Sequence, residues 1–218
     1  MIAFRRLATL ALFSLCSALP ARADWTGTYK LHNEPPGRGR DADQQGNISA
    51  HGTKLRIDAE GPMGKMAMVT DFKAHKGLMI MDARHAFMTV DQDKAQGHGP
   101  FASIHCDSEE SAACLAQVGF TKSGVETVNG KKSDRWEHDF TNAQGAKVHE
   151  TLWVPQGVKG FAVVKEVSKS ADKTTTFDVL DFKEGSVPAE QFEVPAGYTD
   201  MSSRMGPMGP MGPPGAHP

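Results

Sequence analysis

Short runs of alternating apolar and polar residues make up most of the chain, and glycine, asparagine and aspartate separate them. Alternation with a period of two places successive side chains on opposite faces of a β-strand. Turn sequences such as Asn129-Gly130 lie between the runs and favour hairpins. The pattern predicts strands over Thr26–His32, Gln45–Ala50, Lys54–Ala59, Lys65–Phe72, Gly77–Asp82, Ala86–Asp91, Lys131–Phe140, Lys147–Val154, Phe161–Ser168 and Thr174–Phe182.

The predicted strands differ in how many of their faces are apolar. The run Leu78–Met81 is apolar on both faces, whereas in Lys131–Phe140 the residues Trp136, His138 and Phe140 share one face opposite charged side chains. A strand that is apolar on both faces must be covered on both sides. The sequence therefore predicts a mainly β protein, with a curved antiparallel sheet around an apolar interior.

The first 23 residues have the pattern of a signal peptide. Arg5 and Arg6 precede an uncharged apolar run, Leu7–Leu19, and Ala21-Arg22-Ala23 provides the small residues that signal peptidase requires. The apolar run is too short to span the roughly 30 Å hydrocarbon core of a bilayer as a helix. We expect cleavage after Ala23 and export to a bacterial periplasm. No transmembrane segment is expected after the signal is removed.

The charge of the chain argues against polyanionic partners. The formal net charge is -2, and loss of Arg5, Arg6 and Arg22 with the signal would make it -5. Nucleic acids and anionic membranes select clustered lysine and arginine. We therefore expect no nucleic-acid partner.

The two remaining cysteines, Cys106 and Cys114, suggest a disulfide in an oxidising compartment. However, Asp107–Glu110 resembles a capping box that opens a helix through Gln117. Eight residues of helix would separate the two Cα atoms by about 12 Å, more than the ~7 Å that a disulfide tolerates. Either the helix begins later, near Ser111, or the thiols are unpaired; we favour the Cys106–Cys114 bridge.

Several weak motifs, taken in order, resemble a family of bacterial exported proteins. They are Lys54–Asp58, Gly77–Asp82, Phe87–Asp91, Val125–Trp136, Glu150–Val154 and Gln191–Tyr198. Together they resemble the domain of unknown function 4412 family over about Thr26 to Met201, with Ala102–Gln117 as an insertion. This resemblance implies a distantly LolA-like lipoprotein-carrier fold, a half-open β-barrel with one short helical lid segment. Residues 24–202 would then form a single domain.

A carrier fold implies an apolar cavity and no catalysis. The predicted function is a non-enzymatic periplasmic protein that binds an apolar small molecule, or the acyl group of a lipid, and uses no cofactor. The candidate lining residues are Met79, Met81, Met88, Trp136, Phe140 and Trp153. A filled barrel, in which these side chains only pack together and serve structure or interaction, is the competing interpretation.

Methionine supplies a further alternative. Thioether sulfur is a soft ligand suited to Cu(I), so a copper-binding protein could use Met63, Met66, Met68, His85 and Met88. Methionine also fills irregular apolar linings. Met66 and Met68 share a strand face with Phe72, which is expected of core positions.

The remaining motifs are weaker. His149-Glu150 begins like the zinc motif H-E-x-x-H but lacks the second histidine and falls on a predicted strand. The segment 203–218 is rich in glycine and proline and repeats methionine at Met205, Met208 and Met211, which predicts an extended, disordered tail.

Overall fold

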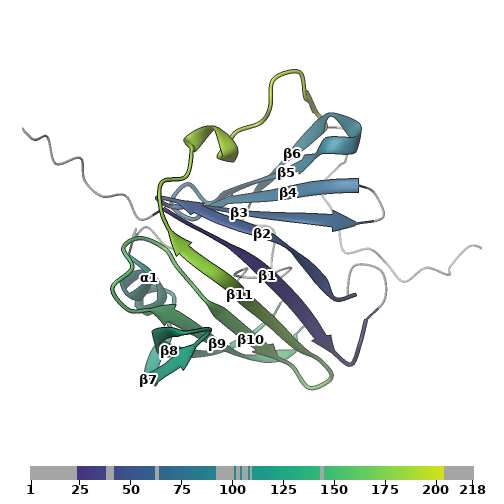
Figure 1. Ribbon diagram of the computed structural model, residues 1–218. Coiled ribbons are helices and arrows are strands. Elements are labelled where there is room, and N and C mark those ends of the chain that lie inside the picture. Colours follow the sequence, from purple (N-terminus) through teal and green to yellow (C-terminus); the bar gives the residue numbers. More distant parts are fainter. Residues whose placement is uncertain are drawn as a thin grey trace, which may run out of the picture.

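The computed structural model in Figure 1 describes residues 24–37, 42–61, 64–91, 110–142 and 145–203, together with residues 101, 104 and 108. The predicted signal peptide, Met63, Cys106 and the tail beyond residue 203 lie outside the described residues. Those predictions are therefore not tested by the structure.

Strands account for most of the described elements. In chain order they are β1 (Trp25–Glu34), β2 (Gln44–His51), β3 (Lys54–Gly61), β4 (Gly64–Asp71), β5 (Lys76–Met81), β6 (Ala86–Asp91), β7 (Thr121–Val128), β8 (Lys131–Thr141), β9 (Lys147–Pro155), β10 (Lys165–Lys169), β11 (Thr174–Glu184) and β12 (Thr199–Asp200). The α-helix in the described part of the chain is α1 (Ser111–Gln117), and two 3₁₀ turns are η2 (Asp82–Arg84) and η3 (Ala189–Phe192).

All of these strands belong to one 12-stranded sheet with the linear order β12-β6-β5-β4-β3-β2-β1-β11-β10-β9-β8-β7. Neighbouring strands are antiparallel except for β12, which runs parallel to β6. Figure 1 shows the sheet turning at β1 and β11, so that β3–β6 and β7–β10 form two separate halves. The mainly β class and the curved, open sheet are confirmed.

Two local predictions are corrected, and one that was left open is decided. Strand β7 was not predicted. It lies at the edge of the sheet and most of its side chains are exposed, so burial imposes no apolar pattern on its sequence. Phe161–Val164 precedes β10 rather than belonging to it. Of the two helix starts that the sequence left open, the later one is confirmed, because α1 begins at Ser111 with Glu110 as its N-cap. The later start of the helix removes the geometric objection to the predicted disulfide, which stays a prediction because Cys106 is not described.

The main core lies on the face of the sheet that α1 covers, which we call the helix-side face. Tyr29, Ile48, Leu152 and Phe177 from four strands form one cluster with Leu115 of α1. Hydrogen bonds fix the helix there, because the Ser111 hydroxyl donates to the Gly160 carbonyl at 2.9 Å and accepts from the Ala162 N–H at 2.8 Å. Burial of these large apolar side chains is the main stabilising contribution.

The C-terminal segment covers the other face of the sheet over β4–β6. Val187 and Phe192 pack there against Ala67, Val69 and Ile80. The segment is held at its start by a hydrogen bond from the Val187 N–H to the Asp24 carboxylate. The two halves of the sheet are therefore covered on opposite faces.

Candidate functional site

Five methionines share the helix-side face of β4, β5 and β6. Strand register places Met66 opposite Met81, and Met68 opposite Met79, which in turn lies opposite Met88. Met68 also pairs with Ile57 of β3, which packs against the main core. Directly paired residues point to the same face of a sheet. We call this surface the methionine face; it consists of Met66, Met68, Met79, Met81 and Met88.

The methionine face is only partly covered. Met88 and Met81 are buried, whereas Met68 is 37% exposed and Met66 and Met79 are partly exposed. Met68 and Val125 are the large hydrophobic side chains that stand exposed in the described part of the chain. The expectation that Met66 and Met68 occupy core positions is therefore wrong. The intervening residues of β4 are the buried ones, because the C-terminal segment packs on their side of the strand.

The predicted lining residues fall on both faces of the sheet. Trp136 pairs with Leu152 and Phe140 pairs with Val148, which places both aromatic rings on the helix-side face. Met79, Met81 and Met88 lie on the same face. Trp153 follows Leu152 and lies on the opposite face. There its indole N–H donates to Glu126, and the Lys165 ammonium lies 5.7 Å from its ring centroid. Trp153 therefore starts from the opposite face of the sheet, although it belongs to the same buried cluster as Trp136.

The helix-side face of β8–β11 is packed. Trp136 is 8% exposed and joins the main core with Leu115, Phe120 and Leu152. The helix-side face keeps exposed apolar surface at Phe140 of β8, at Val125 of β7 and on the methionine face at the other half of the sheet. A separate hollow of about 380 Å³ lies on the first two strands, lined by Thr28, Tyr29, Lys30, Gln45, Gly46, Asn47 and Leu180, which include none of the predicted lining residues.

Two buried glutamates interrupt the packed half. Glu150 and Glu166 lie on the helix-side face of β9 and β10 and are 2% and 6% exposed. The Phe101 N–H donates to Glu166 Oε2 at 2.9 Å. Burial, and then the neighbouring carboxyl of Glu150, raises the pKa of Glu166 well above its usual range. Glu166 is therefore held in its neutral form at pH values where an exposed glutamate is charged.

Sequence reasoning missed this pair, although a signal was present. Glu150 and Leu152 are two positions apart in β9, so a carboxyl group shares the face of a core leucine.

Nearby, His138 Nδ1 and Trp136 Nε1 are buried and have no hydrogen-bond partner among the described residues. Buried polar atoms of this kind are uncommon in proteins.

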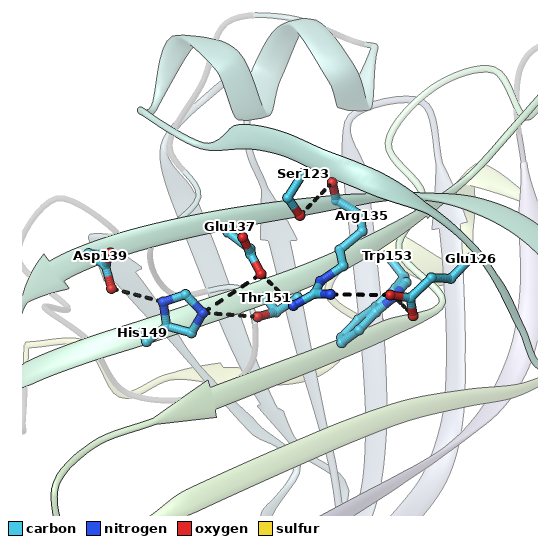
Figure 2. A network of polar contacts seen from close by, with 8 residues as sticks. All are labelled: Ser123, Glu126, Arg135, Glu137, Asp139, His149, Thr151 and Trp153. Atoms are coloured by element: carbon cyan, nitrogen blue, oxygen red, sulfur yellow. Dashed lines mark hydrogen bonds and ion pairs between the residues drawn. The ribbon is translucent and has the colours of Figure 1, made fainter.

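The opposite face of β7–β9 carries a network of charged and polar side chains, shown in Figure 2. Arg135 contacts Glu126 at 3.2 Å and also binds Glu137. His149 contacts the Asp139 carboxylate through Nδ1 at 2.8 Å. The Arg135–Glu126 and His149–Asp139 pairs link neighbouring strands, whereas Arg135 and Glu137 both belong to β8. Exposed pairs of this kind contribute little to stability, about 0–1 kcal/mol each.

Three side chains of this network, a carboxylate, a histidine and a hydroxyl, are connected in the same order as in a catalytic triad. His149 Nε2 lies 3.4 Å from the Thr151 hydroxyl, and Asp139 binds the other ring nitrogen. A nucleophile must reach its substrate, however, and Thr151 is only 5% exposed within a central stretch of β9. The arrangement is best explained as a cross-strand polar ladder.

The residues predicted for a metal site are only partly brought together. Met66, Met68 and Met88 share the methionine face. His85 does not, because it caps η2 in the left-handed conformation and its ring lies 5.5 Å from Tyr198. Within the described residues no group of three or more histidine, cysteine, aspartate or glutamate side chains is placed to hold a metal ion. Any metal site on this face would therefore use sulfur.

Comparisons with known proteins support the fold alone. No family model and no curated protein matches the chain, so membership of the domain of unknown function 4412 family stays a prediction. An uncharacterised conserved protein from Thermus thermophilus is 11% identical, with a TM-score of 0.50 over 82% of this chain and 89% of that one.

Two further structures are less similar. PNGF-II is 11% identical with a TM-score of 0.47, covering 84% of this chain and 32% of its own. A DUF1329 family protein from Desulfovibrio piger is 10% identical with a TM-score of 0.45, covering 80% of this chain and 91% of its own. The comparisons therefore establish a shared curved-sheet fold with the Thermus protein and assign no function.

No helix among the described residues is both long and apolar enough to cross a membrane.

Proposed function

We propose that this protein is an exported, non-enzymatic binding protein that holds an apolar molecule, or the acyl chain of a lipid, against the methionine face. The N-terminal sequence supports export, since it combines two arginines, a short apolar run and small residues before Asp24. The observation that carries the proposal is the partial exposure of five methionines on one face beside a main core that is packed.

The chemistry of the methionine face suits an apolar ligand of variable shape. Methionine has three rotatable side-chain bonds and a polarizable sulfur, so it adapts to different partners at little cost. Ile57 and Ala59 of β3 extend the same apolar surface beside Met68 and Met66. An acyl chain laid across these strands would remove from water the surface that the folded chain leaves exposed.

The experiment measures uptake of an anilinonaphthalene dye and its displacement by palmitate. A charged variant, Met68→Asp, should weaken palmitate binding at least fivefold, because a carboxylate on the face must be desolvated when the chain binds. Val125→Asp is the matched control, since Val125 is similarly exposed but lies on the edge strand β7. We expect the control to bind palmitate like the unaltered protein.

Two results would reject this function. The first is a native protein that takes up no dye, which would favour a filled sheet that serves structure or protein interaction. The second is an equal loss of palmitate binding in Met68→Asp and Val125→Asp, which would place the ligand elsewhere.

A further inference from the structure

Four methionines lie in one row across β4, β5, β6 and the residue that follows β12. Met68 of β4 pairs with Met79 of β5, and Met79 pairs with Met88 of β6. Strand β12 continues the row, because Asp200 pairs with Phe87 and the next residue, Met201, donates its N–H to the Phe87 carbonyl. We call Met68, Met79, Met88 and Met201 the methionine row.

Contacts between these side chains follow the register. Met79 and Met201 pack against Met81, Ala86 and Met88 in a cluster that contains methionine and alanine alone. Met79, Met88 and Met201 therefore meet through their side chains as well. Met68 joins the row through its strand pairing with Met79.

The concentration of sulfur is specific to this cluster. The two other hydrophobic clusters of the described chain are built from leucine, isoleucine, valine, alanine and aromatic residues with one cysteine, and they hold no methionine. If methionine served only to fill gaps in cores, it would be expected in the larger clusters as well. Its segregation into one cross-strand row points to a role for the sulfur atoms.

Thioether sulfur favours soft cations, and Cu(I) is the soft ion that methionine and cysteine select. Paired residues on neighbouring strands have Cβ atoms about 4.5–5.5 Å apart, and the flexible methionine side chain lets adjacent sulfurs turn toward one ion. Met68 is 37% exposed at one end of the row and gives an ion access to it. We propose that three neighbouring members of the methionine row bind one Cu(I) ion through their thioether sulfurs.

This ligand set differs from the one that the sequence suggested. The sequence suggested Met63, Met66, Met68, His85 and Met88. The fold instead aligns Met68 and Met88 with Met79 and Met201. It places His85 beside Tyr198, which packs with the cluster on the opposite face. The inference does not rest on the proposed apolar ligand, because it concerns sulfur and not apolar surface.

A titration with Cu(I) against bicinchoninate under ascorbate tests the site. The triple variant Met68→Leu, Met79→Leu and Met88→Leu keeps apolar volume but removes three sulfurs, so it should bind Cu(I) at least tenfold more weakly. The control variant Met205→Leu, Met208→Leu and Met211→Leu removes the methionines of the tail. We expect it to bind like the unaltered protein.

The outcomes separate the two proposals. Copper binding that survives in the row variant, or that disappears in the tail variant, overturns the copper site. Dye displacement by palmitate is measured on the unaltered protein without copper, so its result reports on the proposed function alone. If the row variant does not fold, methionine-methyl NMR of the unaltered protein replaces it. Cu(I) must then shift the methyl signals of Met79, Met88 and one of their neighbours in the row, and unshifted signals overturn the site.

Discussion

The two halves of the sheet bury opposite faces, and the faces left open differ in chemistry. In β8–β11, α1 and the main core cover the helix-side face, and an ion-pair network occupies the other. In β4–β6, the C-terminal segment covers the opposite face, and methionine side chains form the helix-side face. A single sheet thus presents a charged surface at one half and a partly exposed apolar surface at the other. We infer that binding belongs to the apolar half and that the packed half supplies stability.

The largest expected effect lies in the packed half. Phe177 is 1% exposed. Its ring centroid lies 4.9 Å from that of Tyr29, on which it stacks, and 5.2 Å from that of Phe101. Phe177→Ala should lower the free energy of unfolding by about 3–5 kcal/mol through lost burial and a residual cavity. Urea unfolding measures the change. A loss below about 1 kcal/mol would mean that this half is not the main source of stability.

The C-terminal segment should matter mainly for the other half. Phe192 is 2% exposed and packs against Ala67, Val69 and Ile80. Phe192→Ala should destabilise the protein by about 3 kcal/mol and speed hydrogen exchange in β4 and β5 more than in β9. Equal acceleration in β9 would show that the two halves unfold as one unit.

The buried carboxyl pair makes stability fall as pH rises. Because the pKa of Glu166 is raised in the folded protein, the folded state holds a proton that the unfolded state releases. Its contribution is fully present at low pH and is lost as pH rises above the unfolded value, near 4.5, toward the raised folded pKa. Glu166→Gln should flatten this fall in urea midpoints, whereas the exposed control Glu190→Gln should not. If the urea midpoint of Glu166→Gln falls with pH as steeply as that of the unaltered protein, another titrating group causes the pH dependence.

A conservative change on the methionine face should have little effect on stability. Met79→Leu keeps apolar volume at a partly exposed position, so we expect a change in unfolding free energy of less than about 1.5 kcal/mol. Thermal or urea unfolding checks this value. A cost comparable to that of Phe177→Ala would show that the face is packed as tightly as the main core.

The smallest effect is expected on the charged surface. Arg135 is 37% exposed and pairs with Glu126 and Glu137. Exposed pairs are screened by water and salt, so Arg135→Ala should cost less than about 1 kcal/mol, and less still at high salt. A larger, salt-independent loss would assign the network a structural role.

Much of the fold could be predicted because alternation is strong wherever one face is buried. The strands around Met66, Met79 and Trp136 were placed correctly from their period of two. The edge strand β7 escaped prediction because most of its side chains are exposed. Which face would be covered could not be predicted either, since that depends on where distant segments such as Phe192 pack.

The candidate site shows the same limit. Met79, Met81 and Met88 were named from composition and strand pattern, but their alignment with Met68 and Met201 depends on register between strands. Register is fixed by turns and by the burial of whole faces, which a single run of sequence does not specify. Trp153 was selected for its size, and its position next to Leu152 places it on the other face.

The most direct test of the account is NMR of protein labelled with ¹³C at the methionine methyl groups, titrated with oleate. The account predicts saturable shifts for Met68, Met79 and Met88, which share the methionine face, and none for Met208 in the tail. The absence of shifts on the methionine face at saturating oleate, or shifts confined to the tail, would contradict it.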